Sequence, residues 1–394
     1  MKTVFNMVIT AGILVFLMGT QTVCAEPPLV VAAEFEGGKL YRAGAVSVVE
    51  LNGNYRQMGR QYGMLLKKEL KDLYATAVET FFMKERNVSR GKLLSIARAV
   101  FEPYPQRYRE ILSGTAETSG LSVEQLVLLN ALEWYPKIFT LSPGKCSGIA
   151  AWGPYTSTGT LVFGRNNDDD VLYKRFASFM VVSVFNADDG SLPTALVNYA
   201  GVIYNATGMN REGLFMELNA GPWMGYSLER QSIFVSLFSF LQDYASVADV
   251  HRAFVSTLPN LASIVNVADR SGAVSYEMSL YDTRRVEPQS PGLLVSSNHF
   301  VSTSWPLAAV EDDKAGWTGM RRTNLLALAG KHKGGITHRT MMQILDVPIE
   351  RGGATVEGTI YQVVAVPATL TFWIKMPGIQ DWTEIPLKPL FRVR

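Results

Sequence analysis

The feature that most constrains this chain is the stretch from Gly144 to Asp170, where a single cysteine directly precedes an apolar run. Cys146 follows several turn-forming residues. Two β-rich segments, 147–152 and 160–164, are separated by a Ser-Thr-Gly turn, a pattern typical of a hairpin. A hairpin returns the end of its second strand to the start of its first. We therefore expect the polar cluster at 165–168 to lie beside the cysteine sulfur.

The amino terminus has the features of an export signal. Lys2 precedes an apolar run from Met7 to Leu17, and the small residues that follow predict cleavage after Ala25. The run is short for a membrane span, and no later segment is long and uncharged enough to be one. We expect residues 1–25 to be a signal peptide and the protein to be secreted or periplasmic.

Cysteine usage and net charge narrow the chemistry. Removing residues 1–25 also removes Cys24, so the mature chain has one thiol and no internal disulfide. Cys146 is then either a small buried hydrophobe or a reactive thiol, and its position beside an arginine and an aspartate favours the second. The net charge of +2 becomes +1 without Lys2, and so small a positive charge does not indicate the basic surface of a nucleic-acid-binding protein.

The periodicity of the sequence changes at the cysteine. Before it, helical patterns cover 55–83, 92–101, 106–119 and 123–134, so we expect residues 26–145 to be a mostly helical segment. After it, short alternating strands dominate, interrupted by helical stretches. The pattern for 146–394 predicts stacked antiparallel sheets covered by helices, an α+β fold.

Several short motifs follow one another along the chain. They are LNGNYRQMGRQYG at 51–63, SGTAE at 113–117, LSVEQL at 121–126, Cys146, GRNND at 164–168, GMNREGL at 208–214 with Leu218-Asn219, Ser297-Asn298-His299, and Thr318-x-x-Arg321. Together they resemble the penicillin-acyltransferase-like family of self-cleaving cysteine amidases. More distantly they are similar to choloylglycine hydrolases, penicillin V acylases and acid-ceramidase-like amidases. Thr318 departs from the serine that the resemblance leads us to expect at its position.

The resemblance implies a four-layer αββα fold of the N-terminal-nucleophile hydrolase type. The segment 26–145 would be a prosegment or α chain, and 146–394 would be the catalytic domain or β chain. The chain would cut itself before Cys146, whose new α-amine would then serve as the general base for the thiol.

The same resemblance assigns roles to the other site residues. Arg165 would hold the thiolate by charge, and Asp168 would orient the α-amine. Asn298 would stabilise the oxyanion through its side chain, and Asn219 through its backbone or side chain. Arg321 would support this cluster, although the adjacent Arg322 is an alternative.

No other catalytic or cofactor pattern competes with this one. The four histidines have no metal-ligand spacing, and the sequence has neither a nucleophile-elbow serine motif nor a phosphate-binding glycine loop. The three aspartates at 168–170 lack further ligand spacing for a cation. We therefore expect no metal and no cofactor.

We predict an enzyme that hydrolyses a linear amide or transfers its acyl group. Aromatic and methionine side chains in the early helices and in 222–226 indicate a pocket for an apolar acyl group, with a small polar amine as leaving group. Two alternatives stay open: an inactive secreted binding homologue, and a dipeptidase or phospholipase-like hydrolase on the same fold. The motifs also leave open a homo-oligomer.

Overall fold

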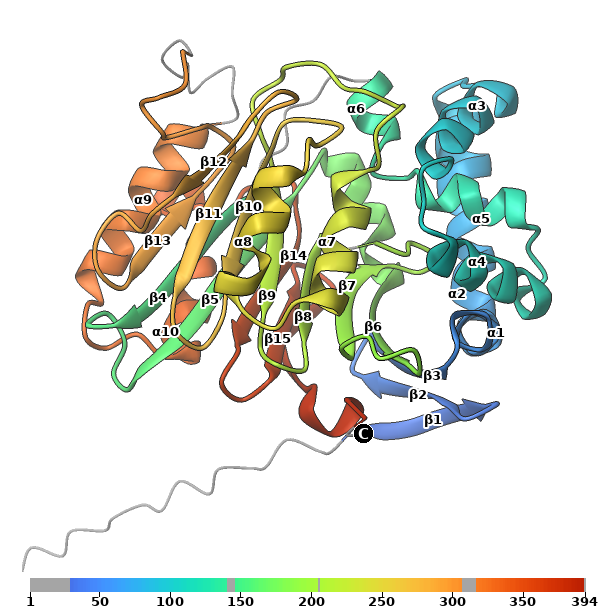
Figure 1. The fold of residues 1–394 in the computed structure, drawn as a ribbon, viewed down its shortest axis with the longest axis horizontal. Coiled ribbons are helices and arrows are strands. Elements are labelled where there is room, and N and C mark those ends of the chain that lie inside the picture. The colour runs from blue at the N-terminus through green and yellow to red at the C-terminus, as the bar shows by residue number, and fades with distance from the viewer. Residues whose placement is uncertain (1–28, 140–145, 205, 307–316, 393–394) are drawn as a thin grey trace, which may run out of the picture.

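A computed structural model describes residues 29–139, 146–204, 206–306 and 317–392 (Figure 1). The predicted signal peptide lies outside these residues. Strands in the described chain form two sheets, one of ten strands and one of six. In the described part of the chain, no helix combines the length and apolar character needed to cross a membrane.

The ten-stranded sheet takes strands from both sides of Cys146. In spatial order its members are β1 (Val30–Phe35), β2 (Gly38–Ala43), β3 (Val46–Gly53), β6 (Met180–Ala187), β7 (Thr194–Tyr199), β8 (Thr207–Asn210), β9 (Phe215–Ala220), β10 (Ser263–Ala268), β11 (Ala273–Met278) and β12 (Thr283–Val286). Within the described residues, β3 and β6 are the one parallel pair of this sheet, where the early strands join the later ones.

The six-stranded sheet contains the hairpin predicted from the sequence. Its spatial order is β13 (Leu293–Ser296), β4 (Ser147–Gly153), β5 (Gly159–Asp168), β14 (Thr359–Val366), β15 (Thr371–Met376) and β16 (Gln380–Pro386). The β4–β5 hairpin is antiparallel, with Gly148 opposite Arg165. The prediction that the second strand ends at 164 is wrong, because pairing with β14 carries β5 through the polar cluster to Asp168.

The two sheets pack face to face, and helices cover their outer faces. Phe215 on β9 contacts Phe163 on β5 and Phe372 on β15, with ring centroids 4.8 and 6.2 Å apart. Helices α7 (Ile233–Asp243) and α8 (Val247–Ser256) cover the ten-stranded sheet, whereas α9 (Thr318–Lys331) and α10 (His338–Leu345) cover the other (Figure 1). The expected four-layer αββα architecture is therefore confirmed.

The segment before Cys146 forms a helical layer at one end of the sandwich (Figure 1). Its helices are α1 (Tyr55–Leu65), α2 (Lys67–Leu73), the π-helical η1 (Tyr74–Glu85), α3 (Arg90–Phe101), α4 (Gln106–Ser119), α5 (Val123–Asn130) and α6 (Tyr135–Phe139). Gly120, with a φ of 76°, ends α4, and the Ser122–Gln125 capping box begins α5, as the sequence indicates.

Three early strands modify the prediction for 26–145. The predicted strand near Val46 is β3, but β1 and β2 were not expected from the sequence. Because β3 pairs with β6, this segment is part of the same ten-stranded sheet as the residues after Cys146. Other short elements also lacked a clear pattern: η2 (Val171–Phe179), η3 (Ile349–Arg351) and η4 (Lys388–Leu390).

Candidate active site

Cys146 lies immediately before β4, and its side chain is buried among polar groups. The residue is 7% exposed. Its sulfur is 3.7 Å from Asn167 Oδ1 and 3.5 Å from the backbone oxygen of Asp168, both within the range for thiol donation. Arg165 Nη2 lies 3.9 Å from the same sulfur. The hairpin thus brings the predicted polar cluster to the thiol, and a purely apolar packing role for Cys146 does not describe this environment.

The environment of Cys146 favours the neutral thiol. Burial raises the pKa of Cys146 to about 11, while the Arg165 guanidinium opposes the rise and the Asp168 carboxylate adds to it. Because the thiolate is the reactive form of a cysteine, any nucleophilic reaction of this thiol at neutral pH requires a group that takes its proton. The Cys146 nitrogen is a peptide amide in this structure and cannot do so.

Arg165 is fully buried between the two sheets and forms an ion pair with Glu217 of β9. Its Nη1 also donates to the Leu218 carbonyl oxygen at 2.9 Å, and its Nη2 donates to Asn167 Oδ1 at 2.7 Å. Burial raises the pKa of Glu217, and the arginine offsets part of that rise. This pair fixes the guanidinium beside the sulfur.

Glu217 was not predicted as a site residue. Its carboxylate is completely buried and accepts hydrogen bonds from the side chains of Asn219 and Asn266. The available signal is a charged glutamate inside the mostly apolar strand Phe215–Ala220, because a buried carboxylate needs a buried cation. The sequence does not show which cation that would be.

Asp168 faces the helices α9 and α10 that cover the six-stranded sheet, rather than the space between the sheets. Alternation along β5 places Arg165 and Asn167 on one face and Asp168 on the other. The Asp168 carboxylate is buried, with one oxygen 3.8 Å from Arg321 Nη1 on α9. The two predicted charged residues therefore approach Cys146 from opposite faces of one strand.

The structure brings Arg321 to the site and leaves Arg322 outside it. Arg321 is fully buried, and it donates from Nη1 to the Cys146 carbonyl oxygen at 2.8 Å and from Nη2 to Asn298 Oδ1 at 2.7 Å. Arg322 is only partly buried, and burial lowers its pKa. The helical periodicity of α9 separates the two, since adjacent residues face different directions.

Thr318 occupies the position where a serine was expected, and its hydroxyl is engaged at the site. Thr318 Oγ1 accepts the backbone N–H of Asn298 at 2.7 Å and lies 2.9 Å from Ser297 Oγ. The substitution preserves the hydroxyl that holds the 297–298 backbone.

Asn298 and Asn219 are both near the cluster, and their side-chain amide groups already have hydrogen-bond partners. Asn298 Nδ2 donates to the Ala220 carbonyl oxygen at 2.8 Å. Asn219 Nδ2 donates to Glu217 Oε1 at 3.2 Å and to Ser296 Oγ at 3.0 Å. The side chain of Asn219 therefore supports Glu217, and only its backbone is left for an oxyanion role.

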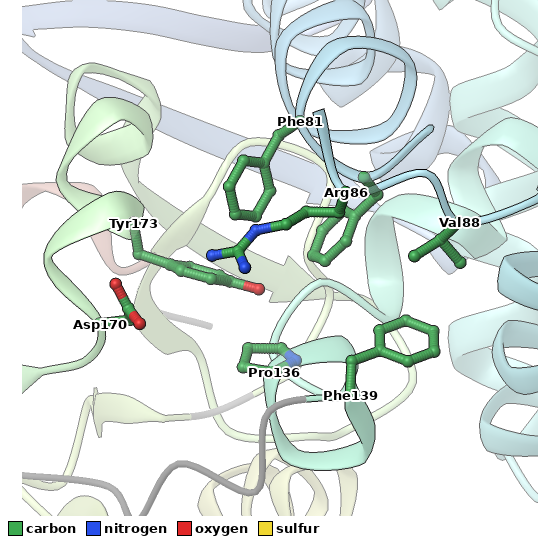
Figure 2. A pocket seen from close by; sticks show the side chains of 8 residues that line it. Phe81, Arg86, Val88, Pro136, Phe139, Asp170 and Tyr173 are labelled. Carbon is green, nitrogen blue, oxygen red and sulfur yellow. The ribbon is translucent and has the colours of Figure 1, made fainter. Parts of the chain in front are cut away.

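One cavity borders the Cys146 thiol, and a second cavity shares the lining residue Tyr173 of η2 with it. The first, of about 30 Å³, is bordered by Cys146, Arg165 and Asp168, and by Glu133 from the segment before Cys146. It has room for about one or two water molecules. The second, of about 280 Å³, lies between η1, α6 and η2 and is lined mainly by aromatic side chains (Figure 2).

The predicted contribution of 222–226 to a pocket is wrong for these cavities. Trp223 is 54% exposed and Tyr226 is 39% exposed, and neither lines either cavity. Their rings pack on each other at 6.1 Å instead. The early helices do contribute, through Phe81, Phe82 and Phe139.

Comparisons with solved structures found proteins of similar fold at low identity. An N-acylethanolamine-hydrolyzing acid amidase ortholog from Caenorhabditis elegans aligns with a TM-score of 0.45 and 17% identity over 59% of this chain and 95% of that chain. A variant of the conjugated bile acid hydrolase from Clostridium perfringens aligns with a TM-score of 0.42 and 14% identity over 62% of this chain and 93% of that chain. Penicillin V acylase from Agrobacterium tumefaciens aligns with a TM-score of 0.43 and 11% identity over 61% of this chain and 86% of that chain. No family model and no curated protein matches the sequence.

Proposed function

We propose that this chain is a self-processing cysteine amidase. The observation that supports this most directly is the convergence on Cys146 of two buried arginines from distant segments of the chain. Arg165 comes from β5 and lies 3.9 Å from the thiol, and Arg321 comes from α9 and binds the Cys146 carbonyl oxygen at 2.8 Å. Buried cations around a thiol favour the thiolate that amide cleavage requires.

The proposed chemistry begins with a cut between Lys145 and Cys146. The new α-amine has an ordinary pKa near ~8, so it can accept the thiol proton and return it to the leaving amine. Asp168 would orient this amine. Asn298 Nδ2 and the Asn219 backbone would stabilise the oxyanion. The cavity of about 30 Å³ beside the thiol is too small for an acyl group in the uncut chain, which fits a site that opens on processing.

Intact mass and amino-terminal sequencing test the cut. The purified protein should consist of two chains, one of which begins at Cys146. Cys146→Ala should remain a single chain because the thiol starts the reaction. A single uncut chain that hydrolyses amides would contradict the mechanism, and an uncut chain that binds ligand without turnover would favour the inactive binding homologue.

We further propose that the aromatic cavity receives an apolar acyl group. Phe81, Phe82 and Phe139 from the proposed prosegment line the cavity of about 280 Å³ together with Tyr173 of the proposed catalytic segment. The ring centroids of Phe81 and Phe82 lie 5.9 and 6.5 Å from that of Tyr173, and Figure 2 shows Phe81, Phe139 and Tyr173 among the lining side chains. Because Tyr173 also lines the cavity at Cys146, a substrate chain lying along this ring would reach from one cavity to the other. The substrate class is thus a linear amide with an aryl-acetyl or fatty acyl group.

An N-acyl series of increasing length tests this pocket. Each buried methylene contributes up to ~0.8 kcal/mol, so kcat/KM should rise up to about fourfold per methylene until the cavity is full. Val88→Trp should shorten the preferred chain, since Val88 is a partly buried lining residue. Val255→Trp on the exposed face of α8 is the matched control. A flat series would contradict the pocket.

A further inference from the structure

Glu133 is a partly buried glutamate whose carboxylate the amidase mechanism above does not use. It lies in the turn between α5 and α6, where Leu132 and Trp134 on either side are 1% and 0% exposed. The backbone N–H of Trp134 donates a hydrogen bond to the Ala131 carbonyl oxygen at 2.9 Å, which stabilises this turn. The backbone at Glu133 is therefore fixed, and its side chain is directed to the cavity that contains Cys146.

The groups around this carboxylate do not neutralise it by direct contact. The other titratable side chains that line the same cavity are Lys137 of α6, Cys146, Arg165 and Asp168 of β5, Asp169 directly after β5, Tyr173 of η2 and Tyr199 of β7. Among the described residues, the Glu133 carboxylate accepts no hydrogen bond and lies in no ion pair within 4 Å. A buried carboxylate with only a structural role is normally hydrogen-bonded or paired. This one is open to the cavity.

The environment also sets when Glu133 can take a proton. Burial raises its pKa to about 7, Lys137 lowers it, Asp169 raises it and Arg165 lowers it. A general base works best when its pKa is close to the working pH. Glu133 therefore changes between acid and base in the neutral range, unlike an ordinary exposed glutamate.

We propose that Glu133 is the proton carrier for the cut before Cys146, acting on the thiol through a water molecule in the shared cavity. This inference rests on the proposed self-processing. The need for such a group is specific to the uncut chain, where the Cys146 nitrogen is an amide and no α-amine is present. The prosegment would thus supply the base for its own release.

The steps balance without any further reactant than water. The thiol proton passes to the Glu133 carboxylate as the sulfur attacks the carbonyl carbon before Cys146. The C–S bond forms, the C–N bond breaks, and the proton moves from Glu133 to the departing nitrogen. Water then attacks the thioester, its proton passes to Glu133, the C–S bond breaks, and the proton returns to the sulfur. The products are a carboxyl terminus and a free cysteine amine.

A processing time course tests this role. The full chain is made by cell-free translation and then incubated at pH 5 to 9, with the cut followed by electrophoresis. In wild type the rate should rise with pH and level off above about 7, because only the deprotonated carboxylate accepts the thiol proton. Glu133→Gln should be at least 10²-fold slower and lack this midpoint. Glu133→Asp, which retains the carboxylate, should recover part of the rate with a shifted midpoint.

The control is Glu79→Gln, an exposed prosegment glutamate on η1, which should process like wild type. Processing of Glu133→Gln at the wild-type rate, or a slower cut that keeps the midpoint near 7, would overturn the proposal while self-processing stands. If Glu133→Gln does not fold, an unshifted midpoint in Glu133→Asp would overturn it equally. A wild-type chain that never cuts would instead remove the proposed function, and this inference with it.

Discussion

Arg321 and Cys146 are 175 positions apart in the chain, yet the Arg321 guanidinium donates a 2.8 Å hydrogen bond to the Cys146 backbone carbonyl oxygen. The same guanidinium donates to the side chain of Asn298, so one planar group positions both Cys146 and Asn298. A lysine ammonium cannot make these two hydrogen bonds with the same planar geometry. The contact therefore makes the position of Cys146 depend on helix α9.

This relationship predicts unequal effects at adjacent arginines. Arg321→Lys should slow processing by roughly 10²-fold or more, because the Cys146 carbonyl and Asn298 lose their shared donor. Arg322→Lys on the same helix is the matched control and should process normally. The measurement is the fraction of cut chain over time, and equal rates in both variants would show that Arg321 has only a packing role.

The buried pair of Arg165 and Glu217 predicts a coupling in stability. In the uncut Cys146→Ala chain, Arg165→Met should lower the free energy of unfolding by about 3–5 kcal/mol, since it leaves the Glu217 carboxylate buried without its cation. Adding Glu217→Gln removes that charge and should restore part of the loss. Urea unfolding of both single variants and the double variant gives the coupling, and simple additivity would refute it.

Gly148 lies opposite Arg165 on the hairpin and predicts a steric effect. A Cβ there would overlap Glu217 Oε1 and approach Asn266 Nδ2 to 2.8 Å. Gly148→Ala should therefore cost about 1–3 kcal/mol and impair processing. Gly330→Ala on α9 meets open space and should stabilise the chain by about 0.5–1 kcal/mol. Thermal unfolding of the two variants decides this, and a neutral Gly148→Ala would contradict it.

Glu133 predicts how stability changes with pH. Its pKa is about 7 in the folded chain and 4.5 without burial, so its stabilising contribution is complete below pH 4.5 and is lost as the pH rises to 7. Glu133→Gln avoids this loss. Between pH 4.5 and 8, its stability relative to the parent should increase by about 1–3 kcal/mol, when both carry Cys146→Ala. A difference that does not change with pH would show that the carboxyl is not perturbed.

Local patterns in the sequence were sufficient for much of the framework. The Ser-Thr-Gly turn between apolar runs predicted the β4–β5 hairpin, and with it the approach of Arg165 and Asp168 to Cys146. Gly120 predicted where α4 ends, and the capping box that starts at Ser122 predicted where α5 begins. These features depend on contacts between residues close in the chain, which is why they are visible in the sequence.

Tertiary structure decided the rest, because it depends on which distant surfaces pack together. Strands β1 and β2 have no sharp pattern of their own and are defined by pairing next to β3. The pairing of Glu217 with Arg165 requires the two sheets to stack, and the choice of Arg321 over Arg322 requires α9 to lie on β4 and β13. The sequence by itself determined the cysteine and its hairpin, whereas only the packing of prosegment, sheets and α9 determined which buried charges surround it.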